Sequence, residues 1–162
     1  MTKCVYAGSF DPVTCGHIDI IERAAKSFGK VIIAVPVNIE KKYTFSKDQR
    51  IEFIRKSTAH IDDVSIDTVD GLLVDFVKAK GAGVIVKGLR TMSDFEYEFQ
   101  MASINRTLSS DIDTVFMMAD PKLSFISSTL VRELIFHGGS LKGLVPECII
   151  GDIKKYIGGE KS

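Results

Sequence analysis

Short apolar runs alternate along the chain with longer amphipathic stretches. Residues 31–35 are continuously apolar, as in a strand buried on both faces of a sheet, and residues 84–86 repeat the pattern. Shorter apolar segments at residues 3–6 and 114–118 predict two further strands, and residues 64–66 predict a weaker one. The chain therefore contains five expected strands.

Helical signals fill the intervals between these runs. Apolar residues recur at helical spacing from Ile18 to Phe28, and Gly29 follows as a stop signal. The sequences Ser46–Gln49 and Ser93–Glu96 each match a capping box and predict a helix start. Further helices are expected at residues 72–80, after Ser127 or Ser128, and from Pro146 as the first residue of a last helix.

The order of these elements alternates strand and helix and ends in two helices. Such alternation predicts an α/β fold, here a Rossmann-like, doubly wound, five-stranded parallel sheet with C-terminal helices. We expect residues 1–162 to form a single domain. Ligands of such sheets bind outside the carboxyl ends of the strands. The chemistry is therefore expected in the loops after Tyr6, Val35, Val86 and Met118.

Composition narrows the classes of function. The net charge is +0, so no overall charge recruits the chain to nucleic acid or to an anionic membrane. The three cysteines show no metal-ligand spacing, and an odd, scattered set fits a reducing compartment. No apolar run reaches the ~20 residues that cross a bilayer, and the first six residues predict a strand rather than a signal peptide. We expect a cytoplasmic protein.

The first loop, residues 8–17, brings several anion-binding groups together. Ser9 supplies a hydroxyl, and His17 lies where the first helix begins, at free N–H groups and the positive end of the helix dipole. This arrangement suits a phosphate chain. Taken alone, Ser9 and Asp11 could equally be ordinary turn residues, and His17 could bond only locally.

Cations follow two other strands. Lys41 lies in the loop after the second strand, and Lys87 and Arg90 flank a glycine near the end of the fourth, which suits a phosphate clamp. Each could instead be a solvated or ion-paired surface residue. Glu98 could bind a ribose hydroxyl or pair with a cation.

The loop after the fifth strand carries three successive hydroxyls, Ser127, Ser128 and Thr129, at a helix start. Helix capping needs only one of them, so the excess favours an anion site. The sequence has no G-x-x-x-x-G-K-[ST] loop and no G-x-G-x-x-G after the first strand, which argues against a P-loop enzyme or a dinucleotide oxidoreductase.

Together these segments resemble the nucleotidyltransferase superfamily. Residues 8–12 (GSFDP) followed by 14–17 (TCGH) are similar to its GTFDP…(H/T)xGH signature, with Thr14 typical of the phosphopantetheine adenylyltransferase branch. Residues 87–90 (KGLR), 94–98 (DFEYE) and 125–129 (FISST) resemble further segments of that family. Ser9, Lys87 and Leu123 replace the commoner Thr, Arg and aromatic residue.

The resemblance implies roles residue by residue. It implies that His17, Lys41 and Arg90 are catalytic, and that Ser9, Lys41, Leu73 and Lys87 bind the acceptor substrate. It implies an ATP site formed by Ser9, Phe10, His17, Gly88, Leu89, Arg90, Glu98, Leu123, Ser124, Phe125, Ile126, Ser127, Ser128 and Thr129.

The implied reaction moves AMP from ATP onto 4′-phosphopantetheine, giving 3′-dephospho-coenzyme A and pyrophosphate in coenzyme A biosynthesis. The acceptor phosphate is nearly a dianion at pH 7, so in-line attack needs no general base and no covalent intermediate. We expect Mg²⁺ on the phosphates with no protein metal ligand, no nucleic-acid or membrane partner, and by resemblance a homohexamer.

Two alternatives stay open at this point. A related transferase could use nicotinamide mononucleotide, or CTP with a sugar or alcohol phosphate. A non-catalytic nucleotide-binding module would bind ATP and release no pyrophosphate.

Overall fold

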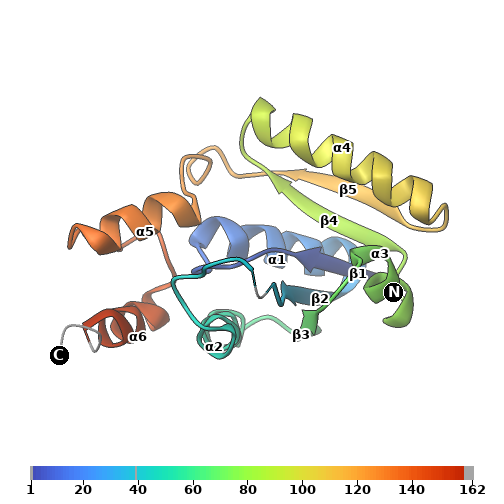
Figure 1. Ribbon diagram of the computed structural model, residues 1–162. Helices are drawn as coiled ribbons and strands as arrows, with labels where there is room; N and C mark the ends of the chain where they lie inside the picture. The colour runs from blue at the N-terminus through green and yellow to red at the C-terminus, as the bar shows by residue number, and fades with distance from the viewer. Residues whose placement is uncertain (1, 39, 159–162) are drawn as a thin grey trace.

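A computed structural model describes residues 2–38 and 40–158 of the protein. It contains a five-stranded parallel sheet with helices on both sides (Figure 1). The elements in chain order are β1 (Thr2–Ala7), α1 (Cys15–Phe28), β2 (Gly29–Pro36), α2 (Lys47–Ser57), β3 (Val64–Val69), α3 (Leu73–Ala79), β4 (Val84–Leu89), α4 (Met92–Leu108), β5 (Asp113–Met118), α5 (Ser128–Phe136) and α6 (Glu147–Gly158).

The strand order β3-β2-β1-β4-β5 confirms the doubly wound topology. The chain first builds outward from β1 to β3 and then returns to pair β4 with the other side of β1. The order reverses between β1 and β4, which is where open α/β sheets bind their ligands. The loops after β1 and β4 meet at this point.

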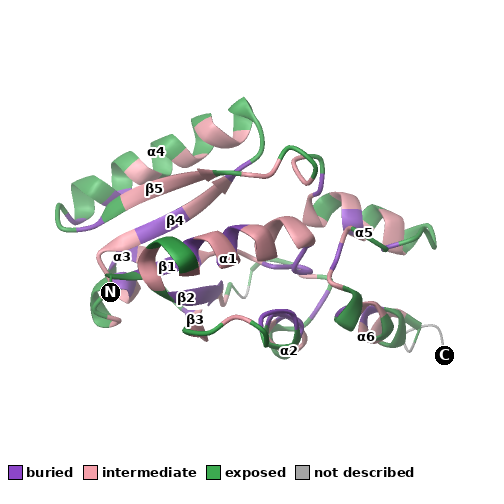
Figure 2. Cartoon of the chain, turned by 180° about the vertical axis from the view of Figure 1, so that it is seen from behind, coloured by how far each residue is buried: buried purple, intermediate pink, exposed green. Residues whose placement is uncertain are grey.

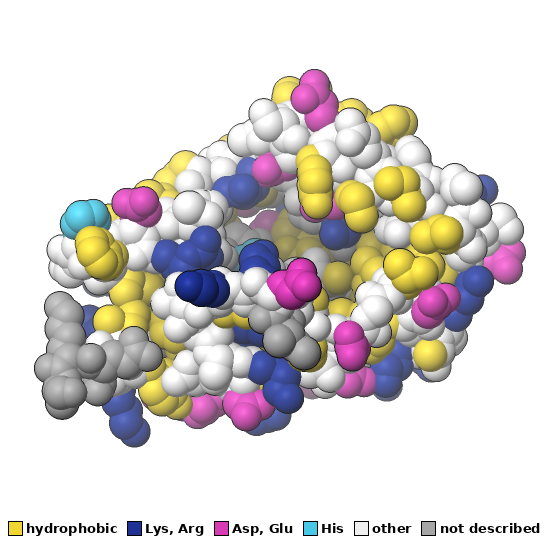
Figure 3. Space-filling model, in the orientation of Figure 1, with side chains coloured by type: hydrophobic (Ala, Val, Ile, Leu, Met, Phe, Trp, Pro, Cys, Tyr) yellow, Lys and Arg dark blue, Asp and Glu magenta, His cyan; other side chains and the backbone are white. Residues whose placement is uncertain are grey.

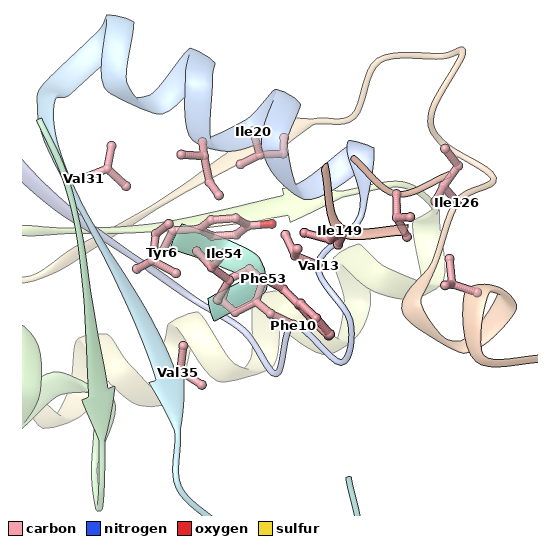
Figure 4. Packing of buried hydrophobic residues seen from close by; sticks show 14 of the residues in the cluster. Tyr6, Phe10, Val13, Ile20, Val31, Val35, Phe53, Ile54, Ile126 and Ile149 are labelled. Atoms are coloured by element: carbon pink, nitrogen blue, oxygen red, sulfur yellow. The ribbon is translucent and has the colours of Figure 1, made fainter. Parts of the chain in front are cut away.

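The two faces of the sheet are covered very differently. A large core packs α1, α2, α5 and α6 against one face, and its labelled side chains converge from β1, α1, α2 and α6 in Figure 4. A small core packs α3 against the other face. Figure 1 shows α3 in front of the sheet, and Figure 2, the view from behind, shows α1 in front.

Local signals placed most elements correctly. The Ser46 box opens α2, with the Gln49 amide N–H donating to Ser46 Oγ at 3.2 Å, and Gly29 ends α1 with a φ of 91°. The predicted cap at Ser93 was wrong. Thr91 caps α4 instead, because its hydroxyl accepts from the Asp94 amide at 3.1 Å and the helix has already begun at Met92.

Two further boundaries differ from the expected ones. β4 continues through Leu89, because Lys87, Gly88 and Leu89 stay in register with β5, so Lys87 projects from a strand rather than from a loop. Pro146 precedes α6 rather than opening it, and its carbonyl accepts from the Ile149 amide at 3.1 Å. Within the described residues, no helix combines the length and apolar character that crossing a membrane requires.

Candidate active site

A cavity of about 500 Å³ opens at the carboxyl end of the sheet, between the first loop, β4, α4 and the start of α5. Figure 3 shows it as a hollow with Lys and Arg side chains around it. The predicted residues that line it are Ser9, Phe10, His17, Lys41, Lys87, Gly88, Arg90, Glu98, Leu123, Ile126, Ser127, Ser128 and Thr129.

His17 occupies the third position of α1, and the first loop fixes its ring. The Thr14 amide N–H donates to Nδ1 at 3.0 Å, and the Thr14 hydroxyl accepts from the His17 amide at 3.3 Å. His17 thus completes a capping box in the place of the usual Glu or Gln. A backbone N–H can only donate, so Nδ1 carries no proton and the neutral ring has its proton on Nε2. The imidazole is therefore prepared as a hydrogen-bond donor through Nε2.

The electrostatic surroundings keep that ring neutral. Burial, and to a smaller extent the positive charge of Arg90, together lower the pKa of His17 from 6.5 to about 4. The Phe10 ring packs edge-on against it with the ring centroids 5.0 Å apart, which removes water from one side. His17 is still partly exposed, to the cavity that it lines.

Ser9 and Lys41 meet at the mouth of the cavity although they are 32 residues apart in sequence. Lys41 Nζ donates to Ser9 Oγ at 3.1 Å. The loop that carries Lys41 is held to the first loop by Asp11, which is 4% exposed and accepts from the Thr44 and Phe45 amides at 2.9 Å each. This juxtaposition places a hydroxyl and an ammonium side by side.

β4 and α4 supply the opposite wall. Lys87 Nζ lies 3.1 Å from Glu98 Oε2, so the alternative of Glu98 pairing with a cation is the one present in this structure. Arg90 donates to the Ile126 carbonyl at 3.2 Å and pairs with Asp94 at 3.3 Å. Both cations are anchored by carboxylates and remain on the cavity wall.

Gly88 allows this wall to approach α1. A Cβ atom at that position would lie 3.1 Å from Ile20 Cγ1 and 3.4 Å from the Tyr6 hydroxyl. A larger residue there would push β4 away from α1 and change the width of the cavity.

The loop that leads into α5, residues 124–129, forms the third wall of the cavity. Ser127 caps α5 through the Leu130 amide at 3.0 Å, so capping uses one hydroxyl as expected. Ser128 instead donates to the Pro12 carbonyl at 2.8 Å, tying this loop to the first one. Thr129 accepts from Arg132 at 3.1 Å.

Four predicted residues lie outside this cavity. Leu89 is 5% exposed in the sheet, the Ser124 hydroxyl donates to the Pro121 carbonyl at 3.0 Å, and Phe125 is 64% exposed. Leu73 lines a neighbouring hollow with Pro36, Val37 and Val69, and both hollows share Ala7.

The structure adds Arg132 and the α4 residues Asp94 and Tyr97 to the cavity wall. Arg132 Nη1 donates to the Asp11 carbonyl at 2.7 Å. A signal for Arg132 was available, because it lies four residues after Ser128 and hence on the same face of a helix. Asp94 and Tyr97 lack such a signal, because which face of α4 meets the cavity depends on tertiary packing.

The donor set fits anions better than a resident cation. Lys41, Lys87, Arg90 and Arg132 line the cavity, whereas its two carboxylates, Asp94 and Glu98, are each paired with a cation. Over the part of the chain that the structure describes, no cluster of three or more His, Cys, Asp or Glu residues could hold a metal.

Comparison with known proteins agrees with this chemistry. Residues 5–134 match the family model described as cytidylyltransferase-like. The chain is 51% identical over 158 residues to the phosphopantetheine adenylyltransferase of Clostridium novyi, covering 98% of each. It is 52% identical over 161 residues to that of Clostridium botulinum strain 657, covering 99% of this chain and 98% of the relative.

A solved structure from Vibrio parahaemolyticus, described as a nicotinate-nucleotide adenylyltransferase, superposes with a TM-score of 0.68. It covers 99% of this chain and 94% of that one at 16% identity. At this identity the likeness concerns the fold alone.

Proposed function

Because the chain belongs to the phosphopantetheine adenylyltransferase family, within the cytidylyltransferase-like proteins, we propose that its cavity transfers the adenylyl group of ATP to 4′-phosphopantetheine. The products are 3′-dephospho-coenzyme A and pyrophosphate, in a step of coenzyme A biosynthesis. One observation carries the proposal: His17 and three cations converge on one cavity with several hydroxyls. The cations are Lys41, Lys87 and Arg90, and the hydroxyls include those of Ser9, Ser127, Ser128 and Thr129.

The reaction is a direct displacement. An oxygen of the acceptor phosphate forms a bond to the α-phosphorus of ATP as the bond to the bridging oxygen of the β-phosphate breaks, and pyrophosphate leaves. The acceptor is already ionised near pH 7, so no base has to remove a proton. The protein's contribution is to bring two anions into line and to stabilise the charge that develops.

His17 supplies a neutral donor for that charge. With Nδ1 engaged by the Thr14 amide, only Nε2–H is left to donate into the cavity. Because its pKa is about 4, the ring is neutral at pH 7 in the free protein and meets the substrates as a neutral donor. Its fixed direction removes the cost of reorienting a dipole during the reaction.

The two substrates occupy different parts of the rim. We place ATP along Arg90, Glu98 and the residues 126–129, because these line the α4 and α5 side of the cavity. The acceptor phosphate is assigned to Ser9, Lys41 and Lys87. The pantetheine arm then extends past Ala7 into the neighbouring hollow, where Leu73, Val37 and Val69 offer apolar contacts.

Mg²⁺ enters this scheme as part of the substrate MgATP. It neutralises phosphate charge and keeps most of its ligands as water and phosphate oxygens. The cations and hydroxyls of the cavity can bind the ATP phosphates, and these phosphates would hold the Mg²⁺ ion.

We further propose a cytoplasmic homo-oligomer, a hexamer by family resemblance. Support comes from α4, which exposes a set of large apolar side chains, and hydrophobic side chains are visible around α4 in Figure 3. These exposed residues are Met92, Tyr97, Phe99, Met101, Ile104 and Leu108. A surface of this kind favours association with further copies of the chain.

The test is pyrophosphate release by the purified protein with MgATP and 4′-phosphopantetheine. Parallel reactions contain nicotinamide mononucleotide as acceptor, or CTP with glycerol phosphate. We expect turnover with the first pair at least a hundred times faster than with the others. Faster turnover with another pair, or ATP binding without any pyrophosphate, would refute the proposal.

A further inference from the structure

Arg50 is a buried cation that the mechanism above does not use. It lies in α2, is 2% exposed and does not line the cavity. Burial lowers its pKa, with partial compensation from Tyr43 and Asp11. Its Nε–H has no hydrogen-bond partner among the residues that the structure describes. Burying a charged group costs desolvation free energy, which contacts with its neighbours have to offset.

Its contacts are with the two loops that carry Ser9 and Lys41. Arg50 Nη1 donates to the Ser9 carbonyl at 2.7 Å. Its guanidinium carbon lies over the Tyr43 ring, 3.9 Å from the centroid. Tyr43 follows Lys41 by two residues. Arg50 therefore contacts both loops without lining the cavity.

Tyr43 is shared with Lys41. Lys41 Nζ lies 5.4 Å from the centroid of the ring against which Arg50 stacks, and it donates to Ser9 Oγ at 3.1 Å. Lys41 is otherwise an exposed residue with a flexible side chain, and exposed lysines lose considerable rotamer entropy when they are held. The backbone of Ser9 and the ring beneath Lys41 are the two points that can limit this freedom.

We propose that Arg50 is a positioning residue for the transfer reaction, which holds Ser9 and Lys41 at a fixed separation through the Ser9 carbonyl and the Tyr43 ring. The inference rests on the proposed function of the cavity. A planar guanidinium can stack and donate at the same time, whereas the ammonium of a lysine acts as a point charge. The shape of Arg50, and not its charge alone, is therefore required.

A double-mutant cycle tests whether Arg50 acts through Lys41. Arg50→Met should lower kcat/KM for the acceptor about 100-fold, as expected when a reacting group is misplaced by about 1 Å. In a Lys41→Ala background the same change should cost less than about 5-fold, because one of the two groups whose separation Arg50 fixes is gone. Equal factors in the two backgrounds would overturn the proposal.

Ile54→Ala provides the matched control. Ile54 is fully buried, lies one turn after Arg50 in α2 and contacts neither loop residue by hydrogen bond. Its loss should lower the melting temperature and affect activity by the same factor with or without Lys41. If Ile54→Ala and Lys41→Ala were also non-additive, the cycle would report any destabilisation of α2 and not a specific effect of Arg50. That result would overturn the positioning role.

Arg50→Lys keeps the charge and serves in the same cycle if Arg50→Met does not fold. We expect it to retain less than about a tenth of the wild-type kcat/KM, because stacking and the directed bond cannot both survive. Full activity of Arg50→Lys would mean that charge alone matters.

Calorimetric titration with 4′-phosphopantetheine, whose phosphate is assigned to Ser9 and Lys41, repeats the cycle without turnover. Arg50→Met should weaken binding several-fold in the wild-type background and little in the Lys41→Ala background. A wild-type protein that binds 4′-phosphopantetheine but releases no pyrophosphate with MgATP would contradict the proposed function and leave this cycle interpretable. Absence of 4′-phosphopantetheine binding by the wild type would overturn both.

Discussion

The two faces of the sheet differ in how firmly they hold their share of the active site. On the α1 face, α1, α2, α5 and α6 all contribute fully buried residues, and the loop carrying Ser9 and His17 is tied down from several sides. On the other face, α4 buries only Asn105 of its 17 residues, yet it carries Glu98, and its neighbour β4 carries Lys87. One cavity is thus built from a rigid wall and a thinly supported one.

This difference teaches where each function can be placed. Preorganised donors such as His17 gain from a rigid support, because a misdirected dipole stabilises little charge. A wall that moves relative to the first can instead follow the substrates as they enter and leave. The exposed apolar residues of α4 suggest that further copies of the chain complete its support, as proposed above.

The largest predicted effect is a difference in stability between substitutions on the two faces of the sheet. Ile149→Ala removes a side chain that is 0% exposed in the large core and should lower the free energy of unfolding by about 2–5 kcal/mol. Ile104→Ala, at a position that is 51% exposed on α4, should change monomer stability by less than about 0.5 kcal/mol. Urea unfolding followed by circular dichroism measures both.

The Ile104 change should appear instead in the mass of the assembly. Multi-angle light scattering at micromolar concentration should show a shift to smaller species for Ile104→Ala, and a stronger shift for Ile104→Lys. If Ile104→Ala destabilised the fold as much as Ile149→Ala at unchanged mass, the contrast between the two faces would be wrong.

The next prediction concerns His17, on the rigid α1 side of the cavity. His17→Ala should lower kcat by about 100- to 1000-fold, or roughly 2.7–4 kcal/mol, with a modest change in KM for ATP, because it removes one preorganised donor. Single-turnover kinetics separates the chemical step from product release. An unchanged single-turnover rate would remove His17 from the reaction.

Sequence patterns predicted most of the rigid side. The continuous apolar run at 31–35 is fully buried in β2, and the hydroxyls and His17 of the first loop do reach one cavity. Both predictions rest on local information. A continuous apolar run identifies a buried parallel strand, and ligands of such sheets bind at the carboxyl ends of the strands.

The patterns failed where tertiary contacts decide. The sequence predicted a cap at Ser93, whereas Thr91, two residues earlier, caps α4. Both residues carry a hydroxyl, and the capping-box spacing of Ser93 and Glu96 does not determine where the helix begins. Arg50 could not be identified as buried, because a helix with several charged residues does not reveal which of them faces inward. The pairing of Lys87 with Glu98 joins a strand to a helix, and no local spacing encodes it.

The smallest effect is a pH dependence of stability that belongs to the rigid wall. The pKa of His17 is about 4 in the folded protein and near 6.5 when unfolded, so between these values the unfolded chain binds more protons. The free energy of unfolding should therefore fall as the pH drops from 7 to 5, and about 2 kcal/mol is the upper bound. The actual change should lie below this bound, because part of the ring faces water in the cavity. Above pH 7 this residue should have no effect.

His17→Gln removes the titrating group at similar size and is the matched variant. Urea unfolding at pH 7 and pH 5 should show a smaller loss of stability in His17→Gln than in the wild type, with the difference equal to the contribution of the imidazole. Equal losses in the two proteins would mean that His17 titrates alike in both states. The first loop would then not hold the ring neutral, and the rigid wall would lose the feature that distinguishes it from the α4 side.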